Sequence, residues 1–110
     1  MYPESGVSGN PDLHRVAVVV PRGPNDEHWI DFAGRKLAER FGAARGEGGM
    51  AALEISGITS IMSVVMINCY IRRPLTELDM TIVYGIGQQV YEGLERDGVA
   101  VIIDGDVFLF

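Results

Sequence analysis

The chain has 110 residues, of which 47% are hydrophobic and 22% are charged, and its formal net charge is −6 at pH 7. This size and composition are those of one ordinary globular domain and exclude a disordered or fibrous chain. Nucleic acids and anionic membranes bind basic surfaces, so the acidic balance argues against both as partners.

The N-terminal residues 1–13 contain two prolines and several small polar residues without a hydrophobic period. They predict a disordered leader, and residues 14–110 predict a single domain. The leader lacks the basic and apolar regions of a secretory signal. The longest apolar run is shorter than the roughly 18 residues that a membrane span requires. Cys69 is the only cysteine, so no internal disulfide can form, and we expect the protein in the cytoplasm.

The first strand and helix are predicted from a change of pattern after the leader. Residues 14–20, HRVAVVV, form a β-branched run that is apolar enough to be buried on both faces. Pro24 suits the first position of a helix, and the cap-forming and acidic residues after it suit a helix N-terminus. The apolar stripe of this helix ends at about Phe41, where Gly42 predicts a left-handed cap.

The middle of the chain predicts two adjacent strands. The glycine-rich residues 42–49 predict a flexible loop, and residues 50–56 predict a strand that ends in a Ser56-Gly57 hairpin turn. The next strand could extend from residue 58 to residue 73. This is well beyond the usual length, so we expect a bulge or bend within it.

The two faces of this long strand differ in character. Because successive side chains of a strand point to opposite faces, its odd and even positions can be judged separately. The odd face is expected to be core throughout and contains Ile61, Val65, Ile67, Cys69 and Ile71. The even face is apolar at Met62, Val64 and Met66 and polar at Asn68, Tyr70 and Arg72. The even face is therefore expected to be covered at its start and to reach solvent or a cleft at its end.

The second helix has a clear start signal, because Thr76 and Asp79 match a capping box. Its apolar residues cover nearly half of its circumference, which is more than one sheet needs. Gly85 and Gly87 weaken the helix and predict close packing or a kink. Arg96-Asp97-Gly98 is expected to close the helix.

Two short strands are predicted after the second helix. Residues 99–104, VAVIID, form an apolar run, and residues 107–110 form another. Asp104-Gly105 between them predicts a tight hairpin turn.

The element order β, α, β, β, α, β with a terminal β segment predicts an α+β fold. Its most economical form is the ferredoxin-like βαββαβ plait, an antiparallel or mixed sheet with both helices on one face and a short C-terminal β extension. The other sheet face would be bare, so we expect a homo-oligomer, most simply a homodimer. The residues expected at its interface are Met62, Val64, Met66, Met80, Tyr84 and Tyr91.

A polar group of residues marks the best candidate for a ligand site. Asn68, Tyr70 and Arg72 share a face, and Arg72 and Arg73 precede the N-terminus of the second helix, where an anion could bind. A pocket between sheet and helices would add two aromatic residues. The full set of candidate ligand-binding residues is Trp29, Asn68, Tyr70, Arg72, Arg73 and Tyr84.

Three further features carry weaker signals. His28 beside Asp31 could act in acid-base chemistry, although helix starts favour such residues for capping. Asp104 and Asp106 could hold a cation, although a turn favours the same residues. Cys69 is expected to be an inert core residue. We expect no catalytic constellation, no metal site and no cofactor.

These observations favour a non-enzymatic interaction or regulatory module that self-associates through its sheet and second helix. One alternative is a small cofactor-independent enzyme or ligand binder with a pocket between sheet and helices. Another is an accessory protein, of viral origin for example, that binds a host protein. Topology alone does not decide among them.

Overall fold

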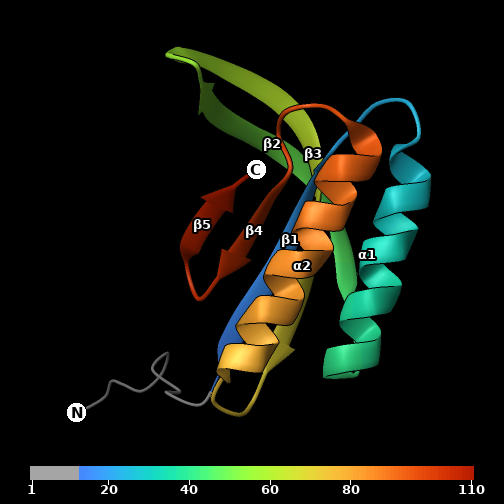
Figure 1. The fold of residues 1–110 in the computed structure, drawn as a ribbon, viewed down its shortest axis with the longest axis vertical. Coiled ribbons are helices and arrows are strands. Elements are labelled where there is room, and N and C mark those ends of the chain that lie inside the picture. The colour runs from blue at the N-terminus through green and yellow to red at the C-terminus, as the bar shows by residue number, and fades with distance from the viewer. Residues whose placement is uncertain (1–12) are drawn as a thin grey trace.

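The computed structural model describes residues 13–110, which form one antiparallel sheet with two helices packed on one of its faces (Figure 1). The predicted leader lies outside the described residues, apart from Leu13. No helix in residues 13–110 is long and apolar enough to cross a membrane. The elements in chain order are β1 His14–Pro21, α1 Asp26–Phe41, β2 Arg45–Ile55, β3 Ile58–Ile71, α2 Glu77–Leu94, β4 Ala100–Ile103 and β5 Asp106–Leu109.

The strand order confirms the predicted α+β class and the ferredoxin-like plait. The five strands lie in the order β2-β3-β1-β4-β5, and every neighbouring pair is antiparallel. The first four strands of this order make the plait, and β5 extends the sheet beyond β4. In Figure 1 both helices lie on the same side of the sheet. The opposite side, which neither helix covers, is called the open face below.

The core lies between the helices and the sheet. Alternate residues of β1 face the helices, and Val16, Val18 and Val20 are completely buried there. Leu37 of α1 and Val83 of α2 are buried against them. Burying such a side chain contributes roughly 1.5 to 3 kcal/mol relative to leaving it exposed, so this layer holds the helices to the sheet.

The β2–β3 hairpin differs from the prediction in two respects. Strand β2 begins at Arg45, so five of the eight residues of the predicted glycine-rich loop are strand. The pairing partner explains this, because β3 supplies backbone hydrogen bonds whatever the side chains of β2 are. The register runs unbroken from the pair Ile55 and Ile58 to the pair Arg45 and Asn68. This excludes a bulge in β3, and the bend that was the alternative stays a prediction.

The tip of this hairpin projects beyond the helices (Figure 1). Ile61 therefore has 72% of its surface exposed, although it shares a face with the buried residues Val65 and Ile67. The prediction of a core face along the whole of β3 holds for the part that lies beneath the helices and fails at the tip. The physical reason is that the alternation of side chains along a strand assigns each residue to a face of the sheet, but it does not show how far the helices extend over that face.

Both tight turns were predicted correctly. Ser56 and Gly57 have φ angles of 55° and 80°, and Asp104 and Gly105 have φ angles of 49° and 92°. Two consecutive left-handed residues suit a hairpin whose strands twist to the right.

The helix ends were predicted in part. The capping box of Thr76 and Asp79 at the start of α2 is confirmed. Helix α1 starts at Asp26, not at Pro24, and the Asn25 side chain makes no capping bond. Instead, the Asp26 carboxylate accepts the Gly23 amide at 3.0 Å and Arg22 Nε at 2.8 Å, which holds the pKa of Asp26 below its usual value.

Each helix ends at a residue whose φ angle is positive. Gly42 has a φ angle of 95° and ends α1 as predicted. Helix α2 ends at Leu94, earlier than predicted, because the left-handed residue is Glu95 with a φ angle of 55°. The predicted closing residues lie in the connection to β4.

The centre of the open face is occupied by the protein's own side chains. Val19, Val64 and Ala100 are almost fully buried there, although no helix covers them. Partly buried apolar side chains pack around this small cluster, namely Ala51, Met62, Met66 and Ile102. Among the predicted interface residues, Val64 is thus already buried within the chain, while Met80 and Tyr84 of α2 are exposed. A role of any of them in an interface stays a prediction.

Candidate functional site

Three polar side chains from three strands meet on the open face. The Arg15 guanidinium donates from Nε and Nη2 to Asn68 Oδ1, at 2.9 and 2.6 Å. Asn68 Nδ2 donates in turn to Glu47 Oε1 at 3.0 Å. Asn68 is only 2% exposed, whereas Glu47 is exposed and Arg15 is half-buried. Arg15, Asn68 and Glu47 are called the polar network below.

The strand register explains why these residues meet. The residues of β1 that face the helices are Val16, Val18 and Val20, so Arg15 points to the open face. Asn68 of β3 lies opposite Ala17 of β1 on one side and Arg45 of β2 on the other. A buried amide needs both a donor and an acceptor as partners. The Arg15 guanidinium donates to the amide oxygen of Asn68, and the Glu47 carboxylate accepts from its amide nitrogen.

The charged groups at the two ends of the network, the Arg15 guanidinium and the Glu47 carboxylate, can each form further hydrogen bonds. The amide of Asn68 separates a guanidinium from a carboxylate, with the amide oxygen towards the cation and the amide nitrogen towards the anion. Within residues 13–110, no carboxylate pairs with Arg15, and its Nη1 makes no hydrogen bond. Glu47 is exposed and can accept further bonds. Paired opposite charges of this kind can bind a zwitterionic ligand.

The structure divides the six predicted ligand-binding residues among separate places. Asn68 and Tyr70 lie on the open face, where Tyr70 is 59% exposed and sits opposite Arg15 in the register. Arg72 follows the end of β3 and is exposed. Trp29 and Tyr84 belong to the helix layer, so the six residues do not line one cavity. Whether each of them binds a ligand stays a prediction.

The two aromatic candidates pack against their own neighbours. The Trp29 ring lies 5.2 Å from the Phe32 ring, centroid to centroid, and covers Gly93 of α2. The Tyr84 ring lies 4.8 Å from that of Phe110. Trp29 thus joins the two helices, and Tyr84 joins α2 to the end of the sheet.

Arg73 is held in a cluster around Asp79, which is completely buried. Arg73 Nη1 lies 2.5 Å from Asp79 Oδ2, and Arg40 of α1 donates from Nε to Asp79 Oδ1 at 2.9 Å. The Thr76 amide also donates to this carboxylate. The Arg73 hydrogen bond and its partners outweigh burial and hold the pKa of Asp79 far below its usual range. This Asp79 cluster fastens the β3–α2 loop to α1.

The weaker candidates from the sequence are also engaged elsewhere. Asp31 pairs with Arg35, and within the described chain it makes no hydrogen bond to His28. Asp104 accepts the Arg15 amide at 2.9 Å and His14 Nδ1 at 2.6 Å. Burial opposes the ionisation of Asp104, but these bonds keep its pKa below the usual value.

Two further groups to consider are clusters of metal-ligating side chains and the thiol of Cys69. Residues 13–110 contain no cluster of three or more side chains that could hold a metal ion. Cys69 is buried, and this burial raises the pKa of its thiol to about 11. The thiol therefore stays protonated at neutral pH, as expected of an inert core residue.

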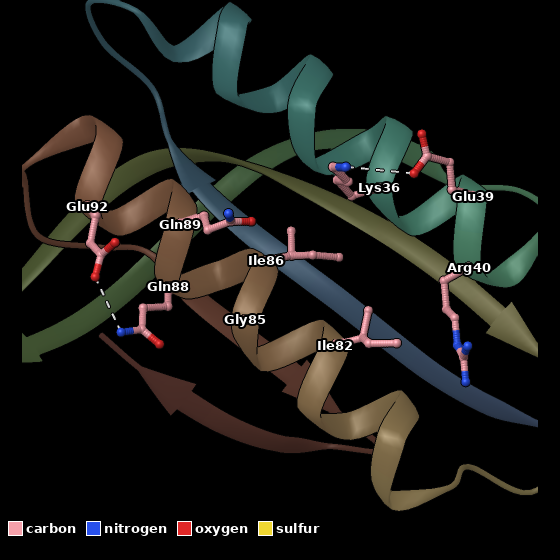
Figure 2. Close-up of a pocket in the computed structure, with 9 residues that line it drawn as sticks. All are labelled: Lys36, Glu39, Arg40, Ile82, Gly85, Ile86, Gln88, Gln89 and Glu92. Carbon is pink, nitrogen blue, oxygen red and sulfur yellow. Dashed lines mark hydrogen bonds and ion pairs between the residues drawn. The ribbon is translucent and has the colours of Figure 1, made fainter.

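Several hollows lie on the helix side of the molecule, among them two that run along α2. The larger one, of about 620 Å³, is a groove between α1 and α2 (Figure 2). Its charged groups are already paired, Lys36 with Glu39, Glu92 with Gln88, and Arg40 with Asp79. The smaller one, of about 340 Å³, lies between α2 and the β4–β5 hairpin and is called the hairpin pocket. It is lined by Met80, Thr81, Tyr84, Ile103, Asp106 and Phe108.

The sequence reasoning missed two of the three residues of the polar network. Arg15 interrupts an otherwise apolar strand, and Glu47 stands within a glycine-rich stretch, which are the only signals of their roles. Their meeting with Asn68 depends on the registers of two strand pairs, and a sequence pattern does not give these registers.

Comparison with known proteins shows a fold that occurs in an enzyme. The chain is similar to a phage SAM lyase in complex with S-methyl-5′-thioadenosine, with a TM-score of 0.55 and 19% identity over 90% of this chain and 89% of that one. It is also similar to a phage SAM lyase in the apo state, with a TM-score of 0.59 and 17% identity over 88% of this chain and 87% of that one. No protein-family model and no curated protein matches the sequence.

These similarities overturn the leading expectation from the sequence. A non-enzymatic interaction module was expected because no catalytic motif could be recognised. Both structures of similar fold are lyases, and this finding contradicts that expectation. The expectation rested on the absence of a local motif, and side chains that meet across three strands, as in the polar network, leave no such motif.

Proposed function

We propose that this protein is a small enzyme that binds S-adenosylmethionine (SAM) on the open face of its sheet and cleaves the bond between its sulfur and its methionyl chain. The product would be S-methyl-5′-thioadenosine, the compound bound by one of the lyases of similar fold. The observation that carries the proposal is the polar network, which holds a guanidinium and a carboxylate on either side of one buried amide.

The amino acid end of SAM matches the polar network in charge. This end carries a carboxylate and an ammonium on the same carbon atom. Arg15 would take the carboxylate, for which a guanidinium is the preferred partner, and Glu47 would take the ammonium. Asn68 fixes both side chains through its amide, so little ordering is needed when the ligand binds.

The neighbouring side chains suit the rest of the ligand. Tyr70 is exposed opposite Arg15 and offers an aromatic ring to the adenine. Met66, whose sulfur lies 4.0 Å from Arg15 Nη2, leads to the buried cluster of Val19 and Val64. The ligand's own carboxylate attacks the carbon atom bonded to sulfur, so the new C–O bond closes a lactone as the C–S bond breaks. The sulfur keeps the electron pair of the broken bond, and the sulfonium becomes a neutral thioether. Apolar surroundings favour a reaction that disperses charge in this way.

The groove between the helices and the hairpin pocket suit this ligand less well. The hairpin pocket has Asp106 as its only charged lining residue, so it offers no cation to the ligand carboxylate. In the groove between the helices, Lys36 and Arg40 are already paired with carboxylates. The polar network is the better match because its guanidinium is bonded to a neutral amide.

Replacement of Glu47 tests the role of the polar network. Glu47→Gln should lower the rate of S-methyl-5′-thioadenosine release from SAM, measured by chromatography, by roughly 10- to 100-fold, because a charged hydrogen bond is lost. Glu54→Gln is the matched control, since Glu54 is an exposed residue of the same strand and lies towards the hairpin tip. Equal activity of both variants, or absence of SAM cleavage by the unaltered protein, would overturn the proposal.

Neither helix covers the open face (Figure 1), and we further propose that a second copy covers it, in the cytoplasm, as a homo-oligomer. Val107 and Leu109 of β5 lie next to Ile102 and Ala100 on this face and are 59% and 43% exposed. Exposed apolar residues beside a buried apolar cluster are typical of an association surface.

Light scattering with matched variants tests this association. Leu109→Asp should reduce the molar mass at micromolar concentration to that of the monomer, because it places a charge on the open face. Leu78→Asp should leave the mass unchanged, since Leu78 is exposed on α2. A monomeric unaltered protein with full activity would contradict the association and leave the polar network as the site.

A further inference from the structure

We propose that the hairpin pocket is a second ligand site, independent of the open face, and that its ligand is a flat aromatic ring that bears a cationic amine. The pocket volume of about 340 Å³ lies within the range of small-molecule sites. Its lining is mostly apolar, with one carboxylate and two hydroxyl groups, so a few polar contacts would orient an otherwise apolar ligand.

Two aromatic rings with free surface form the mouth of this pocket. The rings of Tyr84 and Phe108 lie 6.3 Å apart at an interplanar angle of 77°, and the two residues are 45% and 42% exposed. Large aromatic side chains usually bury more of their surface than this. A flat ring that stacks on one of them and meets the edge of the other would make two favourable aromatic contacts.

The Tyr84 ring is held in place before any ligand binds. The ring of Phe110 lies 4.8 Å from it. Phe110 is fixed in turn, because its amide donates to the Val99 carbonyl at 2.9 Å and its ring lies against Gly87, which has no Cβ to displace it. A rigid aromatic wall loses little conformational entropy on binding, which favours recognition of a rigid ligand.

The charge of the pocket selects a cation. Asp106 is its only charged lining residue and makes no ion pair with any other residue in the range 13–110. The neighbouring carboxylate, Asp104, is already bonded to His14. A cationic amine on the ligand would pair with Asp106 and would also be attracted by the faces of the aromatic rings.

The pocket is separate from the site proposed for SAM. Strand β5 points Asp106 and Phe108 towards α2, and Val107 and Leu109 towards the open face. A substitution of Asp106 or Phe108 should therefore leave SAM cleavage unchanged. The two proposals can fail independently.

Tryptamine is a suitable probe, because it joins a flat indole ring to a cationic amine. Titration of the full chain, followed by two-dimensional amide NMR, should give a dissociation constant on the order of 1 mM, as expected for a ligand of this size. The shifted amides should belong to α2 and the β4–β5 hairpin. Shifts confined to other parts of the protein would overturn the proposal.

Matched variants of two neighbouring residues test the contact between the ligand and the aromatic rings of Tyr84 and Phe108. Phe108→Ala should weaken tryptamine binding at least tenfold, whereas Val107→Ala, a truncation of the adjacent exposed residue on the opposite face, should leave it within twofold. Circular dichroism melting checks that both variants are folded. An equal effect of the two truncations would overturn the aromatic contact.

The charge requirement is tested without altering the wall. Indole-3-propionate, which carries a carboxylate in place of the amine, should bind at least tenfold more weakly than tryptamine. Asp106→Asn should weaken tryptamine binding by about tenfold and leave binding of indole-3-propionate unchanged or improved. Equal binding of the two indoles by the unaltered protein would overturn the proposed cation selectivity.

Discussion

Asp79→Ala should lower the free energy of unfolding by roughly 2 to 4 kcal/mol, measured by urea denaturation, and the melting temperature by about 10 to 20 °C. The Asp79 carboxylate is completely buried and accepts bonds from Arg73, Arg40 and the Thr76 amide. Its loss leaves two guanidinium groups without their shared partner and removes one of the two hydrogen bonds of the α2 capping box. The expected loss in the free energy of unfolding is at the lower end of the range for buried ion pairs, because both guanidiniums can still reach water.

The control for this variant is Asp31→Ala. Asp31 also pairs with an arginine, Arg35, but both side chains of that pair are more than half exposed on α1. Such a pair contributes only a few tenths of a kcal/mol, so this variant should change the melting temperature by no more than a few degrees. Similar losses in the two variants would show that the buried Asp79 cluster has no special importance.

The same cluster should make stability depend on acidity. The pKa of Asp79 lies well below its ordinary value, first because of the Arg73 hydrogen bond. A carboxyl group with a depressed folded-state pKa contributes stability that is fully present above the unfolded pKa and is lost as the pH falls through the folded pKa. The free energy of unfolding should therefore fall as the pH drops below about 4, and this fall should be smaller in Asp79→Ala.

Gly87→Ala should destabilise the protein by roughly 1 to 3 kcal/mol, although alanine is the better helix former. A Cβ at Gly87 would overlap the Cγ1 atom of Val101 and would lie 2.6 Å from the Phe110 ring. Val101 is completely buried in β4 and cannot yield without moving the strand. The loss would be measured as a lower midpoint in chemical denaturation.

Gly85→Ala is the matched control, because it makes the same change two residues away on the same helix. A Cβ at Gly85 meets no atom within 4 Å. Only the higher helix propensity of alanine then remains, and the free energy of unfolding of this variant should rise by up to about 1 kcal/mol. The two substitutions should thus have opposite signs. A gain in stability in both would mean that Gly87 does not serve close packing against β4.

Features that depend on neighbouring residues were predictable from the sequence. The alternation along β3 placed Asn68 and Tyr70 on one face and Ile67 and Cys69 on the other, because side chains alternate in any strand. The capping box at Thr76 was predictable for the same reason, since both of its partners lie within one helical turn.

Features that depend on distant partners were not predictable. The glycine-rich start of β2 is a strand because β3 pairs with it. Ile61 is exposed because the helices end before the hairpin does. Arg15 and Glu47 reach Asn68 only through two strand registers, each set by packing across the whole sheet. The functional hypothesis relied on local motifs, and contacts of this kind leave none.

The position of β1 at the centre of the sheet has a consequence for the order of folding. The β2–β3 hairpin closes through a turn of two residues, and its contacts are local. Strand β1 pairs with residues 64–71 and with β4, at the far end of the chain, so its contacts require long loops to close first. Non-local pairing slows folding, because the loss of loop entropy precedes the gain of contacts. We therefore expect the hairpin to form early and the two central strand pairs, which complete the polar network, to set the folding rate.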